Sequence, residues 1–571
     1  MSASDSRASV GLLDIVKQLP SIAMDAPAIV RGVTTGLLAQ PTTKTSIGKV
    51  FQEYDSDSSA MVVLESDDQL RQAFCWANEA MAAVSHRRLG KGDPNFAPKW
   101  HLFQLAFLLL NLRGISDPAH ADRDKVELLF FPTGGGKTEA YLGVIAVTLL
   151  LRRMRGQGRP DEGLGVAVIL RYTLRLLTLD QLERAAALIC SLELIRHRHP
   201  QQLGTARYAI GLWVGRSGSP NTMAEAKKQI TDYRGNTAES RGSPFPLVNC
   251  PWCEHAIESR GMDTLPRRAE PTRTVVVCAN PECEFSSARR GATETKIGEL
   301  PVLFVDEHVY SELPAFVVST VDKFAMLTHR GQAGKLFGRV HSYTDQQGQP
   351  RQFWSGGDGD DYVVPARSAE ALPEGLFPPD LVIQDELHLI SGPLGTMVGL
   401  FETLVEELCH RTLPSGARVG PKILAATATV RRASTQVQAL YARTPEQTKL
   451  FPPQGVNAWQ TFFAERDTNA NERMYVGLAA TGRSLKRILL QSYLALLGGR
   501  MPDGVMSVDA PLHVGLRQGG ERHVQVNPRG KPSMSHFRVL ERRGGQSYCE
   551  VRIETGRTHQ IRVHARHIGH P

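Results

Sequence analysis

The sequence predicts an α/β fold in which helices cover both faces of a parallel sheet. Apolar runs at 126–131, 166–170 and 381–384 are typical of buried strands. Two long segments with helical periodicity, 139–152 and 178–197, follow the first two of these runs. Because parallel strands need a crossover connection, usually a helix, this alternation favours a parallel sheet.

The length of 571 residues indicates several domains, because a single core stops growing near ~250–300 residues. The composition, with 42% hydrophobic and 22% charged residues, is that of a soluble globular protein. The longest apolar run, 141–151, is well short of the ~20 residues that span a bilayer, and the first residues lack the pattern of a secretory signal. We therefore expect a cytoplasmic protein that contacts no membrane.

The net charge of +8 is concentrated near the C-terminus. Residues 513–571 hold eleven Lys and Arg against four Glu, whereas the preceding 512 residues hold 55 basic and 54 acidic residues. Charge therefore gives no argument that the larger part of the chain binds nucleic acid. The basic tail could attract RNA or DNA through the phosphate backbone.

Changes of pattern divide the chain into four regions, at 1–97, 98–440, 441–510 and 511–571. The first region shows no recognisable chemistry. The second carries the strand–helix alternation, interrupted by a cysteine-bearing insertion at about 245–290, and its stretch 328–370 is rich in Gly, Gln and Asp, so we expect surface loops there.

A glycine-rich turn follows the strand at 126–131 and opens the next helix. It reads Thr133, Gly134, Gly135, Gly136, Lys137 and Thr138. Consecutive glycines let backbone N–H groups converge on phosphate oxygens, and the helix N-terminus adds a partial positive charge. The turn therefore predicts an ATP site in which Lys137 contacts the β- and γ-phosphates and Thr138 ligates Mg²⁺.

Two adjacent carboxylates, Asp385 and Glu386, come directly after the strand at 381–384. The carboxyl ends of parallel strands are where such sheets bind ligands. Asp385 is expected to hold Mg²⁺, and Glu386 to orient and deprotonate the attacking water. The string 305–308 contains a second Asp–Glu pair, which is the weaker candidate because no further motif follows it.

Further motifs occur in the order that a nucleotide-driven motor requires. Thr427 and Thr429 would couple the nucleotide state to the grip on nucleic acid, Gln104 could contact adenine, and residues 319–323 could contact nucleic acid. These motifs predict a RecA-like lobe at 98–440. A motor of this kind needs a second RecA-like lobe, which residues 441–510 would begin but leave incomplete.

Over about residues 98–500 the sequence resembles the DrmA type of DISARM anti-phage helicases, which are similar to superfamily two helicases. The resemblance rests on FPTGGGKTEAY (131–141), VVSTVDK (317–323), QDELHLISGPLGTMVG (384–399), AATATVRRA (425–433) and GLAATGRSLKR (477–487). It implies ATP-dependent work on DNA within a complex of defence proteins.

Two pairs of closely spaced cysteines lie in the insertion. The first pair is Cys250 and Cys253, and the second is Cys278 and Cys283. Pairs at this spacing let four thiolates converge tetrahedrally on Zn²⁺. We expect a structural zinc ribbon, with reduced and unliganded cysteines as the alternative.

The C-terminal region carries a motif that is unrelated to the nucleotide motifs. Its string ETGRTHQIRVH (554–564), with Arg557, His559, Gln560 and Arg562, resembles the C-terminal part of an RluA-type pseudouridine synthase. In that family an arginine pairs with the catalytic aspartate, and Arg562 matches it here, but no matching aspartate loop occurs in the chain. Three functions therefore stay open, namely a nucleic-acid-directed ATPase, an RNA pseudouridine synthase, and a fusion fragment without activity.

Overall fold

The computed structural model describes most of the chain between residues 60 and 452 and most of the chain after residue 503. The described residues are 9–11, 60–91, 93, 95–131, 135–173, 175–215, 218–235, 243–267, 269–287, 297–345, 350–355, 366–428, 433–452, 484, 486, 489, 504–516, 522–528, 530–543, 546–557 and 559–569. The chain forms two compact units, Met1–Ala470 and Asn471–Pro571.

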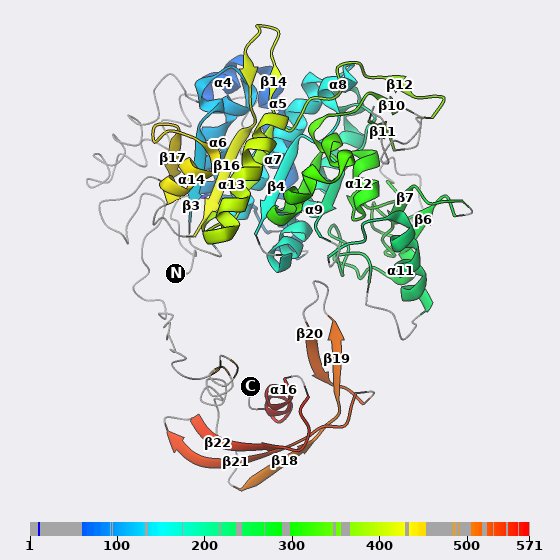
Figure 1. The fold of residues 1–571 in the computed structure, drawn as a ribbon, viewed down its shortest axis with the longest axis vertical. Helices are drawn as coiled ribbons and strands as arrows, with labels where there is room; N and C mark the ends of the chain where they lie inside the picture. The colour runs from blue at the N-terminus through cyan, green and yellow to red at the C-terminus, as the bar shows by residue number, and fades with distance from the viewer. Residues whose placement is uncertain are drawn as a thin grey trace. The chain divides into compact units, whose positions relative to one another are not determined.

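The first unit is built on an eight-stranded sheet in which every strand pairing is parallel (Figure 1). The strand order is β17-β3-β16-β13-β4-β9-β5-β8. The bounds of these strands are β3 Val126–Phe130, β4 Val168–Tyr172, β5 Ile210–Trp213, β8 Val302–Leu303, β9 Phe316–Thr320, β13 Leu381–Gln384, β16 Lys422–Thr427 and β17 Thr448–Phe451. The prediction of an α/β fold with a large parallel sheet is confirmed.

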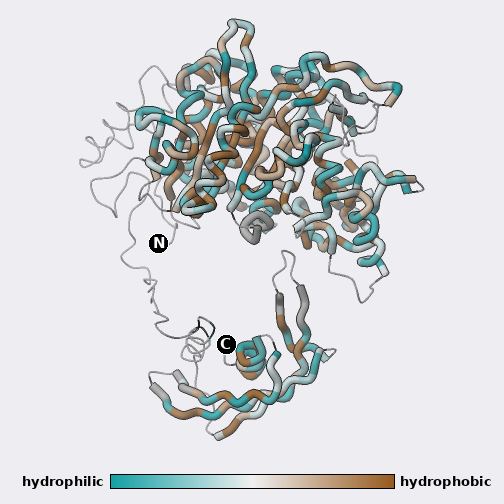
Figure 2. The backbone as a smooth tube through the Cα atoms, in the orientation of Figure 1, coloured by the Kyte–Doolittle hydropathy of each residue, from teal (hydrophilic) through white to brown (hydrophobic). Residues whose placement is uncertain are grey.

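Helices cover both faces of this sheet. Successive side chains of each strand point to opposite sides, so each strand contributes apolar side chains to a core on both faces. Leu381 and Ile383 of β13 join the core beneath one set of helices, whereas Val382 joins the core on the other face. The helices of the first face are α4 Ala60–Ser66, α5 Asp68–Arg88, α6 Leu102–Ser116, α7 Lys137–Arg155 and α9 Arg175–Arg198. Those of the second face are α12 Asp306–Glu312, α13 Gly392–Leu408 and α14 Ala433–Tyr441. Figure 2 shows hydrophobic residues gathered along the central strands of the sheet.

The segment 328–370 was expected to form surface loops, and this expectation is wrong for its described part. It contains a 3-10 helix, η5 Gly331–Phe337, and the strands β10 Ser342–Thr344, β11 Gln352–Trp354 and β12 Glu370–Ala371, which form a small antiparallel sheet. Phe337, Tyr343 and Phe353 are buried in the core of the second face. A few aromatic side chains anchor the segment despite its polar composition.

The cysteine-bearing insertion leaves the main sheet after β5 and returns to it at β8. Its described elements are α11 Met223–Gly235 and the antiparallel pair β6 Met262–Leu265 and β7 Arg273–Val276. At the other end of the sheet, β17 pairs with β3. The sheet therefore extends to residue 451, beyond the boundary at 440 that the sequence indicated.

The second unit contains an antiparallel sheet, a strand pair and a helix. Strands β18 Val505–Asp509, β21 Met534–Arg543 and β22 Gln546–Ile553 form the sheet, β19 Leu512–Leu516 pairs with β20 Arg522–Val526, and α16 spans Gln560–His567. Phe537, Cys549 and Ala565 lie in its small core. Among the described helices of the whole chain, none is long and apolar enough to cross a membrane.

Candidate functional site

The glycine-rich turn lies at the carboxyl end of β3, where α7 begins. Pro132, Thr133 and Gly134 lie outside the described residues. Gly136 has a φ of +87°, and a Cβ at this position would lie 2.6 Å from Nε2 of Gln104. The left-handed backbone favours glycine here, and the amide of Gln104 occupies the space that a Cβ would take.

Lys137 and Thr138 are both buried at the start of α7. Nζ of Lys137 donates a hydrogen bond to the carbonyl oxygen of Phe131 at 2.8 Å. Burial lowers the pKa of Lys137, and the charges of Glu386 and Asp385 oppose that shift. The amine is thus held by the backbone at the end of β3, and the charges of the two carboxylates act on its pKa.

The two carboxylates lie at the same edge of the sheet as the turn. The parallel register places Gln384, the last residue of β13, beside Ala425 of β16, and Thr427 of β16 beside Phe130 of β3. Burial raises the pKa of Asp385 to about 6, and the charge of Glu386 adds to the shift. Burial disfavours the charged form of this carboxylate, and a bound cation would favour that form again.

Tyr141 connects the helix to the strand that carries the carboxylates. Its hydroxyl lies 2.9 Å from Oδ2 of Asp385, 3.3 Å from Oγ1 of Thr138 and 2.9 Å from the hydroxyl of Tyr172. Sequence reasoning did not select Tyr141 or Tyr172. Both belong to apolar segments, and the only signal was the position of Tyr141 on the helix that opens with Lys137.

Glu386 has a φ of +49°, a left-handed conformation that non-glycine residues seldom adopt. Its Oε2 lies 3.3 Å from Nδ1 of His388, and the same ring nitrogen lies 3.3 Å from Oγ1 of Thr427. Thr429 lies outside the described residues. The acidic motif and the motif at the end of β16 are therefore joined through one imidazole.

Gln104 lies beside the turn, with both ends of its amide bonded to backbone atoms. Nε2 donates to the carbonyl oxygen of Gly136 at 2.8 Å, and Oε1 accepts from the amide of His101 at 2.9 Å. The side chain thus connects the start of α6 to the glycine turn.

The second Asp–Glu pair, at 306–307, has structural partners. Asp306 forms an ion pair with Lys323 at 2.5 Å, and Glu307 accepts a hydrogen bond from the amide of Met223 at 2.6 Å. Neither carboxylate lies at the glycine turn. This arrangement agrees with the choice of Asp385 and Glu386 as the candidate pair.

The four cysteines of the insertion converge. All their sulfur atoms lie within 4.8 Å of one another, and the set is Cys250, Cys253, Cys278 and Cys283. Three of them are buried in the main core, and Cys253 is half-buried. Four sulfurs at these separations fit the tetrahedral thiolate site of a structural zinc ion.

The cysteine cluster is packed against α5 of the same unit. Oε2 of Glu284 accepts a hydrogen bond from the indole of Trp252 at 2.8 Å, and the guanidinium of Arg87 lies 4.0 Å from the centroid of the Trp252 ring. The cluster therefore supports the helical face of the unit as well as its own turns.

In the second unit the motif residues separate into two groups. Gln560 is buried and bonds to Met534, Ser535, Thr555 and Arg557. Its role in this unit is to fix the turn that precedes α16.

The other three motif residues, Arg557, His559 and Arg562, are exposed. Among the described residues, Arg562 has no carboxylate partner. The arrangement that the synthase family uses, an arginine paired with an aspartate, is therefore not formed within the described part of the chain.

Comparison with known proteins gives two resemblances. Over 412 residues the chain is 37% identical to the DISARM protein DrmA of Bacillus paralicheniformis. This alignment covers 70% of this chain and 35% of DrmA. A family model described as RNA pseudouridylate synthase matches residues 459–567, which begins earlier than the expected boundary at 511. Over 81 residues the chain is 47% identical to ribosomal large subunit pseudouridine synthase C of Escherichia coli, covering 14% of this chain and 25% of that enzyme.

Among solved structures, the chain is similar to the DUF1998 helicase MrfA bound to DNA, with a TM-score of 0.30, 11% identity and coverage of 65% of this chain and 27% of that one. The chain spans about a third of the length of DrmA and a quarter of the synthase. It is therefore similar to DrmA over most of its own length and to RNA pseudouridylate synthases in its C-terminal part.

Proposed function

We propose that the first unit is a RecA-like lobe of an ATP-dependent helicase or translocase that acts on nucleic acid. The observation that carries this proposal is the meeting of Lys137 and Thr138 with Asp385 and Glu386 at one edge of the parallel sheet. Tyr141 joins the two motifs through hydrogen bonds to Thr138 and Asp385. A glycine turn, a buried amine and two carboxylates form the donor set that a nucleoside triphosphate with Mg²⁺ requires.

Each residue of the site has a distinct task in this proposal. The turn from Thr133 to Thr138 cradles the phosphates, and Lys137 offsets their negative charge. Thr138 and Asp385 would hold Mg²⁺, which would supply positive charge to neutralise the phosphates. Glu386 orients and deprotonates water, and Gln104 either contacts adenine or positions the turn through Gly136.

The link from Glu386 through His388 to Thr427 supports a coupling role for the motif at the end of β16. Any shift of the Glu386 carboxylate on hydrolysis changes the environment of His388, which Thr427 shares. Thr427, with Thr429, would pass this change to the surface that holds nucleic acid. The cysteine cluster, with zinc, would keep the insertion fixed to the lobe as a zinc ribbon.

The likeness to DrmA supports a role in phage defence, with DNA as the substrate and other defence proteins as partners. The region 441–510 would begin a second RecA-like lobe. Nucleotide binding would use the first unit alone, whereas turnover would also need a second lobe that closes over the nucleotide.

The proposal is tested by ATP binding and hydrolysis with and without DNA. Lys137→Ala should lower the affinity for ATP by at least tenfold, whereas Glu386→Gln should bind ATP normally and abolish hydrolysis. Glu307→Gln, in the second Asp–Glu pair, is the matched control and should leave hydrolysis unchanged. Equal ATP affinity in the wild-type protein and Lys137→Ala would refute the assignment of the phosphate loop.

The match of residues 459–567 to RNA pseudouridylate synthases favours a second candidate function, the binding and isomerisation of uridine in RNA. The exposed Arg557, His559 and Arg562 would contact RNA, but isomerisation needs a nucleophilic aspartate beside Arg562. We expect no conversion. Pseudouridine formation that Arg562→Ala abolishes would place this function first, and a chain inactive in both assays would be a fusion fragment.

A further inference from the structure

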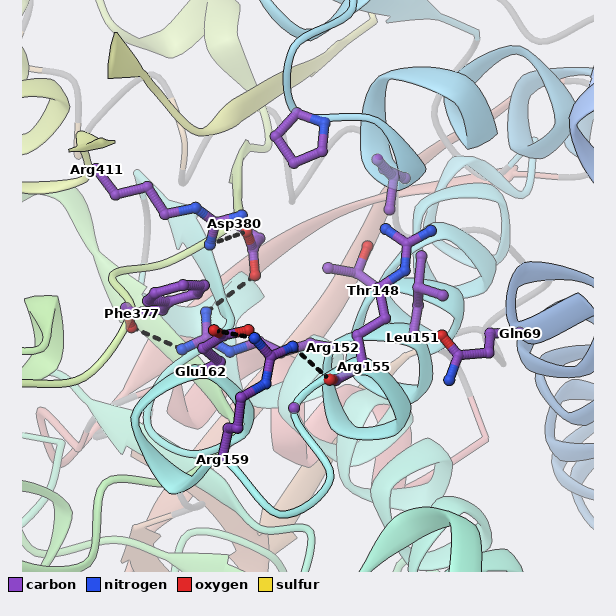
Figure 3. Close-up of a pocket in the computed structure, with 13 residues that line it drawn as sticks. Gln69, Thr148, Leu151, Arg152, Arg155, Arg159, Glu162, Phe377, Asp380 and Arg411 are labelled. Atoms are coloured by element: carbon purple, nitrogen blue, oxygen red, sulfur yellow. Dashed lines mark hydrogen bonds and ion pairs between the residues drawn. The ribbon is translucent and has the colours of Figure 1, made fainter. Parts of the chain in front are cut away.

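A cavity with a volume of about 420 Å³ opens at the edge of the sheet opposite the phosphate loop. Its lining comes from α5, the C-terminal end of α6, the last turns of α7, the following residues 156–162, the segment that leads into β13, and Arg411 (Figure 3). Asp380 directly precedes β13, whereas Asp385 directly follows it. Asp380 and Asp385 are five residue steps apart, which places the cavity and the candidate nucleotide site about 16 Å from each other at ~3.3 Å per residue.

The lining of this cavity carries an excess of positive charge. Four of the lining side chains are arginines and two are carboxylates, which leaves a net charge of +2. The arginines are Arg152, Arg155, Arg159 and Arg411, and the carboxylates are Glu162 and Asp380. Cavities of this volume are in the range that binds small molecules, ~300–1,000 Å³. A concave basic surface attracts anions.

One carboxylate is shared by three arginines at the base of the cavity. Asp380 forms ion pairs with Arg152 at 2.9 Å, with Arg411 at 3.0 Å and with Arg123 at 3.3 Å. Burial lowers the pKa of Arg152, and Arg411 lowers it further while Asp380 opposes the shift. Three guanidinium groups share this one carboxylate, so the cluster as a whole keeps a positive charge.

The guanidinium groups are held in place by the surrounding backbone. Arg152 donates to the carbonyl oxygens of Phe377, Pro378 and Leu164 at 2.6–2.8 Å. Among the described residues, the buried Nε atoms of Arg152 and Arg411 have no hydrogen-bond acceptor. Groups fixed before a ligand arrives lose little entropy on binding it.

The remainder of the lining is apolar. Ile115, Pro118, Leu151 and Phe377 line the cavity beside the arginines, and the guanidinium of Arg411 lies 4.3 Å from the centroid of the Phe377 ring. Such a lining offers contacts to the carbon atoms of a ligand as well as to its charge. A bare inorganic anion would leave these apolar contacts unused.

We propose that this cavity binds a small phosphate monoester, an organic molecule whose phosphate lies among Arg152, Arg159 and Arg411 and whose carbon part lies against Leu151 and Phe377. A phosphate has three acceptor oxygens where a carboxylate has two, so it can accept hydrogen bonds from more than one guanidinium group at once. The site is separate from the phosphate loop and does not depend on the function proposed for it.

Binding is tested by titration calorimetry on the full chain with ribose 5-phosphate, ribose and inorganic phosphate. Ribose 5-phosphate should bind at one site per chain, ribose should not bind, and inorganic phosphate should bind at least threefold more weakly than the monoester. Lys137→Ala should bind ribose 5-phosphate as the wild-type protein does. No binding to that variant, or equal affinities for the monoester and either control ligand, would overturn the proposal.

Two rim positions supply variants that leave the buried ion pairs intact. Gln69 is exposed at the rim, and the side chain of Arg159 is 57% exposed and pairs with Glu162. Gln69→Lys should strengthen binding about twofold and Gln69→Glu should weaken it about twofold, while Arg159→Gln should weaken it at least threefold. The same two changes at Gln229, exposed on α11, should have no effect. Equal responses at Gln69 and Gln229 would show that general charge, and not this cavity, attracts the ligand.

Discussion

The hydroxyl of Tyr141 lies 2.9 Å from Oδ2 of Asp385, although the two residues are 244 positions apart in the chain. Tyr141 lies on the helix that begins at Lys137, and Asp385 follows a central strand. A single phenol therefore links the helix that follows the phosphate turn to the acidic motif.

We expect Tyr141→Phe to impair the binding of Mg²⁺ with nucleotide while the fold is retained. The ring would still fill its buried space, but Asp385 would lose one hydrogen bond and Thr138 its neighbouring hydroxyl. The concentration of Mg²⁺ needed for half-maximal binding of ADP should rise about three- to tenfold, which corresponds to roughly 0.7–1.4 kcal/mol, as for a single hydrogen bond. Tyr172→Phe, which removes only the hydroxyl next to Tyr141, is the control and should shift that concentration by less than twofold.

Metal analysis of the purified protein should find about one zinc ion per chain, because four thiolates complete a tetrahedral site. Replacing Cys250 and Cys253 by serine should remove the zinc and lower the melting temperature of the first unit by several degrees, since the cluster shares its core with the main helices. Cys75→Ser, on α5, should retain zinc. A zinc-free double variant with an unchanged melting curve would contradict the structural role.

A buried ion pair should make stability depend on pH through Glu312. Its Oε1 accepts a hydrogen bond from Nε of Arg207 at 2.5 Å, and its Oε2 lies 3.0 Å from Nε2 of His308. Burial alone would raise the pKa of Glu312, but Arg207 and His308 outweigh burial and lower the pKa from 4.5 to about 2. Because the pKa in the folded state is depressed, the stabilisation is complete above pH 4.5 and is lost as the pH falls toward 2.

The shift corresponds to a stabilisation on the order of 3 kcal/mol. Urea unfolding should therefore show a large difference in free energy between the wild-type protein and Glu312→Gln at pH 6–7, and this difference should shrink below pH 4.5. Glu374→Gln, at an exposed position without an ion pair among the described residues, should track the wild-type protein throughout. A difference that stays constant from pH 7 to pH 3 would exclude Glu312 as the titrating group.

The basic character of the second unit predicts salt-sensitive binding of nucleic acid. Arg557, Arg562 and Arg566 are exposed at and near α16. Changing all three to glutamine should reduce the slope of log affinity against log salt by up to about two to three. ATP binding should be unaffected, and an unchanged slope for RNA and DNA would show that these arginines do not contact phosphates.

The sequence predicted the strands and motifs whose local pattern is strong. The apolar runs before Lys137 and Asp385 marked β3 and β13, and the chain order of the motifs placed them at one edge of the sheet. The cysteine cluster was predicted from spacing alone. These features depend on neighbours in the sequence, and periodicity and spacing record such neighbours.

Features that depend on distant partners were not predicted. Strands β5 and β8 flank the insertion and were not predicted, although each lies in a short apolar run, at 208–214 and 302–305. Phe337 and Phe353 have polar neighbours in the sequence, but in the folded protein they pack into the core of the second face. The engagement of Gln104 by Gly136, and of Tyr141 by Asp385, arises only when the sheet has brought the segments together.

The position of β3 in the sheet has a consequence for the order in which the protein can assemble. This strand is synthesised early, yet its two neighbours, β16 and β17, lie about 300 residues further along the chain. Until residue 427 has left the ribosome, the strand that precedes the phosphate turn has open edges on both sides, and one edge stays open until residue 451 has emerged. The nucleotide site is therefore among the last parts of the lobe to mature, and the nascent chain has to keep this apolar strand from pairing elsewhere during that interval.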